Sequence, residues 1–446
     1  MQHTPIAPTE EPTFGLVDRI AVMLTTLIIG ALVGLAAVGF LYVVRWSVAF
    51  WNVSIPTEFR WPVDGWVLNT TVVLCLLAAA AVAGWILTRL ENGRPHGPAD
   101  LILAAQREQS PDLKTGFTSS ALALTSLVGG ASVGIFGPLL HFGGCLADAL
   151  GRWGGRLSLH VPKPIVLGSG AAAAISAAFL SPIGAAVFAH EAIVRRFGAF
   201  GAGPIILSSF AGYWTAKLSM GQERLFAVSS TAPALEASSV GLALAVGVCT
   251  ALVSVIYIQT LTTMPVWAKA TGIPLRWRPL VPALLLIALS PVLPHLLGPG
   301  MSTVDLALSG QLGLVLLLLL LVMKVLTTSV CVAFGLFGGV FAPALFLGAM
   351  TGGVVDWALV AAGVDTPHSF AMLGAASCIA AVIGAPLASI IMVFEITGSY
   401  EWTVLAMLSV VTTSQISRTL VGRSLFDRQL ALRGIHLRDD HHHGVG

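Results

Sequence analysis

The chain has 446 residues, of which 56% are hydrophobic and only 10% are charged, and its formal net charge is +2. A soluble protein of this length would need far more polar surface, so the composition predicts an all-α polytopic membrane protein. The small net charge argues against nucleic acid as a partner. No clustered nucleophile and base and no metal motif such as H-E-x-x-H is present, so we expect no enzyme activity, no cofactor and no metal site.

In chain order, residues 1–16 are polar and lack the basic region and cleavage site of a signal peptide, so we expect a cytoplasmic leader. Long apolar stretches predict full membrane spans at 15–50, 66–89, 240–263, 280–297 and 312–332. Shorter helices, broken by Gly or Pro, are predicted at 99–109, 116–130, 139–150, 165–180, 183–194, 201–213, 344–362, 372–383, 387–396 and 404–416. Broken helices must be buried in protein or line a wet cavity, so this pattern favours a transporter or channel.

Basic residues predict the orientation in the membrane. Five arginines crowd the C-terminal region, and they are Arg418, Arg423, Arg428, Arg433 and Arg438. Because basic loops stay on the cytoplasmic side, we expect both termini in the cytoplasm of a multi-pass protein of the cell (inner) membrane.

Two stretches of the chain repeat each other. Phe136 and Phe341 lie in two Gly-x-Phe-x-Pro runs, at an offset of 341 − 136 = 205. Pro182 and Pro386 continue the match at an offset of 386 − 182 = 204, as do Glu191 and Glu395. The predicted parts are a first membrane repeat at 17–218, a connecting segment at 219–238, a second repeat at 239–434 and a cytoplasmic tail at 435–446.

Each Gly-x-Phe-x-Pro run predicts a helix start, because proline suits the first helical position. The free N–H groups at a helix start carry partial positive charge and can hold an anion. The groups expected to do so are those of Ile135, Phe136 and Gly137, which follow Gly134, and those of Val340, Phe341 and Ala342, which follow Gly339. Two such starts would form an anion site without a charged side chain, and dipoles suit chloride or a similar monovalent anion.

With these motifs, the chain resembles the CLC family of chloride channels and proton/chloride antiporters over about 17–433. The run Gly338–Pro343 fits the family's GxFxP motif, and the stretch Gly170–Glu191 is similar to the segment after the family's GREGP motif. The resemblance implies an inverted-repeat CLC-type fold with many short, broken helices, in a lipid bilayer. It also implies a homodimer with one pore in each subunit.

The chain departs from the family at the residues that handle ions. The gating glutamate of GREGP is replaced by Phe136, and the anion-binding serine of GSGIP by Pro95, which His96 and Gly97 follow. The tyrosine that bonds the central anion falls on Phe426, and the inner proton-accepting glutamate falls on Ala192. Phenylalanine has no titratable group, so we predict passive anion conduction without proton coupling.

Several alternatives stay open at this point. A proton-coupled chloride antiporter would need a substitute carrier, for which His141, His190 and Glu191 are the candidates. Phe136 either permits the pore or plugs it. The imidazole of His96 either replaces the lost serine donor or lies in a loop. Lys324 either raises the potential near the pore or pairs with a carboxylate, and the matched Glu191 and Glu395 favour a structural role.

Overall fold

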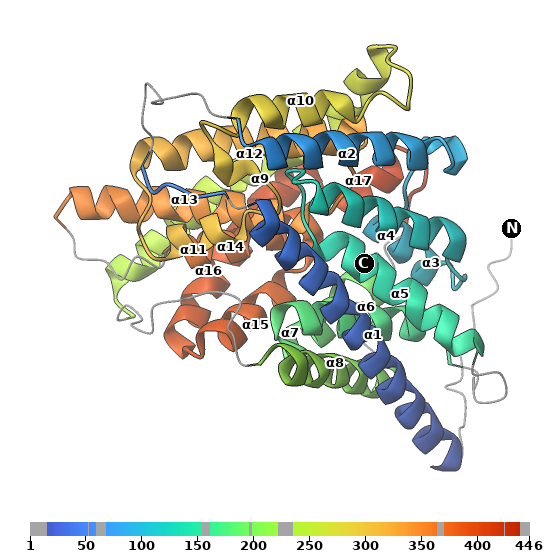
Figure 1. Cartoon of the computed structure of the whole chain (residues 1–446). Helices are drawn as coiled ribbons and strands as arrows, with labels where there is room; N and C mark the ends of the chain where they lie inside the picture. The colour runs from blue at the N-terminus through green and yellow to red at the C-terminus, as the bar shows by residue number, and fades with distance from the viewer. Residues whose placement is uncertain are drawn as a thin grey trace, which may run out of the picture.

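Helix α1 (Leu16–Trp51) runs obliquely across the molecule (Figure 1). It begins the part of the chain that the computed structural model describes, namely residues 16–51, 53–58, 68–153, 161–195, 199–221, 235–363, 370–422 and 424–437. Most of the predicted leader, connecting segment and tail lies outside the described residues. Apart from one isolated β-bridge, the regular elements in the described ranges are helices, which confirms the all-α prediction.

The first half of the chain packs α1 along α6 and α8, while α5 lies on α6. Local chemistry fixes several helix starts. The Asn69 side chain accepts the N–H groups of Thr71 and Val72, and Pro98 and Pro182 occupy the first positions of their helices. The helices after α1 are α2 (Thr70–Leu87), η1 (Glu91–Gly93), α3 (Pro98–Gln106), α4 (Leu113–Val128), α5 (Phe136–Trp153), α6 (Lys163–Phe179), α7 (Pro182–Phe188), the π-helix η3 (Ala189–Val194) and α8 (Ala199–Met220).

The second half continues with α9 (Ala237–Ala270), α10 (Leu280–Leu289), η4 (Pro294–Leu296), α11 (Met301–Leu308), α12 (Leu314–Phe334), α13 (Phe341–Ala361), α14 (Phe370–Ile379), the π-helix η5 (Ala380–Gly384), α15 (Pro386–Thr397), α16 (Tyr400–Val421) and α17 (Leu425–Ala431). Within the described residues, six stretches are long and apolar enough to cross a membrane: 19–51, 70–87, 237–270, 314–334, 341–361 and 400–431. Shorter helices fill the space between them, as the sequence predicted.

Four of the predicted lengths are wrong. The stretches 201–213, 344–362 and 404–416 were expected to be short or interrupted, but α8, α13 and α16 contain 22, 21 and 22 residues. The glycines of α13 do not break it. They allow close packing, since a Cβ at Gly348 would lie 2.1 Å from the carbonyl oxygen of Gly374 on α14. Conversely, 280–297 does not form one span, because α10 ends at Leu289.

The two halves form an inverted repeat. The equivalent helices α5 and α13 both start at the phenylalanine of the shared motif, and α7 and α15 both start at the shared proline. The segments before α5 and α13 meet as an antiparallel bridge between Gly134 and Gly339. Equivalent segments of an inverted repeat run in opposite directions where they meet, so the bridge agrees with the predicted inversion.

Two glutamates tie the halves together reciprocally. The carboxylate of Glu395, at the end of α15, accepts the N–H groups of Ile183 (2.9 Å) and Gly184 (2.8 Å) at the start of α7. The carboxylate of Glu191 in η3 accepts the N–H groups of two residues at the start of α15, Leu387 (3.1 Å) and Ala388 (2.9 Å). Each half therefore caps a helix of the other.

We expect Glu395→Gln to destabilise the protein by about 1–3 kcal/mol, because one oxygen that accepts a buried N–H becomes a donor. Glu191→Gln should do the same. The measurement is the thermal unfolding midpoint in detergent, with the exposed Glu108→Gln as a matched control. Equal midpoints for Glu395→Gln and Glu108→Gln would show that the reciprocal caps do not hold the halves together.

Candidate anion-binding site

The bridge between Gly134 and Gly339 brings the two predicted helix starts together. The N–H of Gly134 donates to the carbonyl of Gly339 (2.6 Å), and the N–H of Gly339 donates to the carbonyl of Gly134 (2.7 Å). A Cβ at Gly339 would lie 2.8 Å from the amide nitrogen of Gly137, and a Cβ at Gly134 would lie 3.0 Å from that of Ala342. Only glycine fits this contact, so the motif glycines set how closely α5 and α13 approach.

The first turns of α5 and α13 carry the unused donors. N–H groups in a first helical turn have no intrahelical acceptor, and Pro138 and Pro343 have no N–H at all. Among the residues that the structure describes, no hydrogen-bond acceptor faces the N–H groups of Ile135, Phe136, Gly137, Val340, Phe341 and Ala342. The two positive helix ends therefore meet with free donors, as an anion site requires.

Four phenylalanine rings close over these helix starts. The ring of Phe136 lies 4.1 Å from that of Phe179 and 5.5 Å from that of Phe341, between centroids. The Phe341 ring also contacts Phe179 (5.4 Å) and Phe188 (6.1 Å). Phe136 is fully buried. We call these residues the Phe cluster; the sequence pointed to Phe136 and Phe341, while Phe179 and Phe188 join them only through the tertiary fold.

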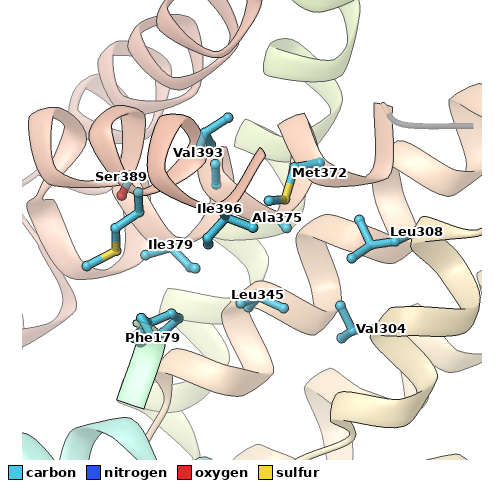
Figure 2. A pocket seen from close by; sticks show the side chains of 12 residues that line it. Phe179, Val304, Leu308, Leu345, Met372, Ala375, Ile379, Ser389, Val393 and Ile396 are labelled. Carbon is cyan, nitrogen blue, oxygen red and sulfur yellow. The ribbon is translucent and has the colours of Figure 1, made fainter. Parts of the chain in front are cut away.

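An apolar cavity of about 30 Å³ lies on one side of the Phe cluster (Figure 2). Phe179 forms one end of it, and Leu345 on α13 lies beside that ring. The remaining walls come from α11, α14 and α15, with Val304, Leu308, Met372, Ala375, Ala376, Ile379, Ser389, Met392, Val393 and Ile396. A wall this apolar does not hold an anion, but it leaves room for a ring of the Phe cluster to shift.

Pro95, His96 and Gly97, which stand in place of the family's GSGIP motif, lie directly before α3. The N–H of His96 donates to the Ser119 hydroxyl (2.8 Å), and the N–H of Gly97 donates to the carboxylate of Asp100 (3.0 Å). Pro95, which is half-buried, has no N–H to give. The backbone N–H groups of His96 and Gly97 are therefore occupied, and the imidazole of His96 is the remaining side-chain donor of this motif.

Burial favours the neutral form of the His96 ring. Burial lowers the pKa of His96, and Arg94 and Arg433 act in the same direction, while the carboxylates of Asp100 and Asp112 oppose them. Asp100 is paired with Arg94 and Arg433, each at 2.9 Å. Burial raises the pKa of Asp100, but the two arginines outweigh it and hold that pKa below its usual value. A neutral imidazole offers one N–H donor.

The remaining predicted site residues are buried next to these elements. Phe426 lies on α17, which packs against α3 and η5, and Ala192 lies in η3. His141 is buried on α5, with its ring centroid 6.3 Å from that of His96, and His190 is buried in η3. Glu191 is engaged in capping α15, as described above.

Lys324 is fully buried in α12. Its Nζ donates to the carbonyl of Gly298 (3.2 Å) and lies 4.9 Å from the ring centroid of Phe346. No carboxylate oxygen of the described residues lies within 4.0 Å of it, so of the two alternatives the ion pair is absent there. One turn along, the Thr327 hydroxyl bonds that of Ser132 (3.1 Å), two residues before Gly134. The ammonium group is thus held one helical turn from the segment that leads into the anion site.

Comparison with known proteins agrees with this geometry. Residues 77–418 match the family model described as voltage gated chloride channel. The chain belongs to this family, the CLC family. It is 30% identical to a putative chloride channel protein ClcB-like of Ralstonia nicotianae, over 70% of this chain and 74% of that protein. It is 24% identical to the voltage-gated ClC-type chloride channel ClcB of Salmonella typhimurium, over 79% of this chain and 85% of that one.

Two solved structures share the fold of this CLC protein. One is a slow cyanobacterial Cl⁻/H⁺ antiporter, with a TM-score of 0.79 and 17% identity, over 93% of this chain and 98% of that one. The other is a CLC-type fluoride/proton antiporter, with a TM-score of 0.77 and 20% identity, over 92% and 99%. The protein is therefore a multi-pass, CLC-type anion transporter with the predicted fold.

Proposed function

We propose that this CLC protein conducts chloride, or a similar monovalent anion, passively and without proton exchange. The observation that carries the proposal is the side chain that lies where the starts of α5 and α13 meet. It is the phenyl ring of Phe136, which can neither bind nor release a proton. The free N–H groups of the two helix starts remain to hold the anion.

The absence of a carboxylate also leaves the N–H donors of the two helix starts to the anion alone. An ionised gate would compete with the anion for the same N–H donors, whereas Phe136 leaves them free. A hydrogen bond between a neutral N–H group and an ion contributes about 1.5–3 kcal/mol, so a few such bonds hold the anion and still release it. Weak binding at several sites favours throughput. In this proposal the pore lies between the repeats 17–218 and 239–434, with one pore in each subunit of a homodimer and both termini in the cytoplasm.

The second candidate is a proton-coupled antiporter with a substitute carrier. Its best support is the pair His96 and His141, whose ring centroids lie 6.3 Å apart beside the start of α3. Glu191 is a poorer carrier, because its carboxylate already accepts two backbone N–H groups. The two solved antiporters are under 25% identical to this chain, so they inform its fold and not its coupling.

The test is the reversal potential of currents from protein reconstituted in liposomes, under crossed chloride and proton gradients. We expect the reversal potential to follow the chloride gradient alone and to stay unchanged when only the pH of one side is varied. Fluoride, nitrate and bromide are compared in the same assay. A reversal potential that moves with the pH gradient at symmetric chloride would exclude passive conduction, and His141→Gln would then identify the carrier by abolishing that movement.

A further inference from the structure

The end of α2 and the loop between α9 and α10 together form a basic and aromatic surface. The two segments are in direct contact, since a Cβ at Gly84 would lie 2.1 Å from the carbonyl oxygen of Arg276. In Figure 1, α2 and α10 lie side by side along one edge of the molecule. The surface consists of Trp85 and Arg89 from α2 and its cap, and of Arg276 and Trp277 from the loop; we call it the Trp–Arg surface.

Each arginine of the Trp–Arg surface lies over a tryptophan ring. The guanidinium carbon of Arg89 lies 4.2 Å from the ring centroid of Trp85, and that of Arg276 lies 5.3 Å from that of Trp277. The two indoles are more than half exposed, at 56% and 52%. Stacking occupies the face of a guanidinium group and leaves the five N–H donors around its edge available.

These donors have no partner among the described residues. Among the residues that the structure describes, no carboxylate lies within 4.0 Å of Arg89 or Arg276, and neither side chain donates a hydrogen bond. The neighbouring arginines differ, because Arg94 is paired with Asp100 and the Nε of Arg278 donates to the carbonyl of Ile273. The segments 85–94 and 269–278 carry five basic residues and one acidic residue, Glu91.

We infer that the Trp–Arg surface binds the phosphate headgroup of an anionic phospholipid. The location favours a lipid, because α2 is one of the helices long enough to span the membrane and the surface lies at its end. Exposed tryptophans are typical of the level of the headgroups, and a guanidinium group matches phosphate oxygens bidentately. An acidic peptide would satisfy the charge but would not explain two exposed indoles at the end of a membrane span.

The test measures how much phosphatidylglycerol the purified full-length protein retains, by native mass spectrometry against phosphatidylcholine. We expect wild type to retain phosphatidylglycerol preferentially and the double variant Arg89→Gln/Arg276→Gln to bind it roughly 30-fold more weakly, at about tenfold for each 1.4 kcal/mol. Arg107→Gln, at an exposed arginine without a stacked ring, is the matched control and should bind as wild type does.

A lysine double variant and a soluble competitor test lipid binding further. Arg89→Lys/Arg276→Lys keeps the charge but loses the bidentate fork, so it should give an intermediate affinity even if the glutamine variant folds poorly. Soluble glycerol phosphate separates a free phosphate from a lipid, and we expect it to displace no phosphatidylglycerol at equal concentration. Equal retention by wild type and both double variants, or full displacement by glycerol phosphate, would overturn the inference. The readout is lipid binding, so it does not depend on the proposed passive conduction.

Discussion

Replacing Phe136 with alanine should increase chloride flux roughly tenfold or more. The Phe136 ring packs against Phe179 and Phe341 where α5 and α13 start, and we propose that it gates the pathway there. Each aromatic pair contributes about 0.5–1.5 kcal/mol. Losing both pairs therefore favours the open pathway between the two helix starts by about 1–3 kcal/mol. The measurement is the initial rate of chloride efflux from liposomes that contain equal amounts of folded protein.

This variant must be separated from a general loss of stability, since truncating a buried phenylalanine costs about 3–5 kcal/mol. Phe117→Ala is the control, because Phe117 forms an edge-to-face pair with Phe142 (5.7 Å between centroids) outside the Phe cluster. Its flux should stay at the wild-type level. If Phe136→Ala folds but its flux does not rise, the Phe136 ring is no gate. If neither wild type nor Phe136→Ala conducts, the protein is better described as a non-conducting scaffold.

The cavity beside Phe179 gives the gate a physical means of opening. A ring packed on all sides can move only if the core around it moves, because protein interiors are close-packed. The Phe cluster is different, since Phe179 borders an apolar cavity of about 30 Å³ (Figure 2). Moving Phe179 toward Leu345 would release its stacking on Phe136 without breaking a hydrogen bond. In this proposal, wild-type flux depends on how often the rings part.

The sequence predicted the fold and the meeting of the two helix starts because the repeat is written in residues with fixed geometric roles. Proline marks where α7 and α15 begin, and Glu191 and Glu395 occupy equivalent positions because each caps a helix of the other half. Both repeats retain these proline and glutamate positions, so they can be recognised in the sequence without any knowledge of tertiary contacts. Their equivalence also indicated a structural role for these two glutamates, which the hydrogen bonds agree with.

The lengths of three helices were misread because glycine and polar residues act differently inside a membrane protein. Gly352 in α13 resembles a helix break in the sequence, but a Cβ there would lie 2.1 Å from the carbonyl oxygen of Phe370 on α14. It serves close packing between helices. In α16, Thr413 donates its hydroxyl to the carbonyls of Ser409 and Gly247, so its polarity is satisfied within the helix and by α9.

The hydrogen-bond partner of the His96 N–H could not be predicted from the sequence, because it lies far away along the chain. The N–H of His96 is taken by Ser119, 23 residues away on α4, and nothing in the motif itself indicates this partner. The same applies to Phe179 and Phe188, which join the Phe cluster from α6 and α7. Sequence patterns locate a helix start, but tertiary packing decides which of its donors remain free.

Gly339→Ala and Gly134→Ala should each abolish chloride flux. A Cβ at Gly339 would lie 3.0 Å from the carbonyl oxygen of Gly134, and a Cβ at Gly134 would lie 2.9 Å from the Cδ of Pro343. The atoms in the way are backbone and proline ring, which cannot rotate aside, so the two helix starts must separate. Overpacking of this kind costs about 1–3 kcal/mol, less than many folded proteins have in reserve, so we expect folded protein with a disrupted site.

The control variants are Gly39→Ala in α1 and Gly241→Ala in α9, where an added Cβ would meet no atom within 4 Å. Both should conduct and unfold like wild type. Combining Gly339→Ala with Phe136→Ala separates a closed gate from a broken site. An intact site behind a closed gate would regain flux when the ring is removed, whereas separated helix starts would not. We expect the combined variant to show no chloride flux, while Phe136→Ala alone conducts. A combined variant that conducts as well as Phe136→Ala would mean that the anion does not need the two helix starts in contact, and that its donors must be sought elsewhere along the pathway.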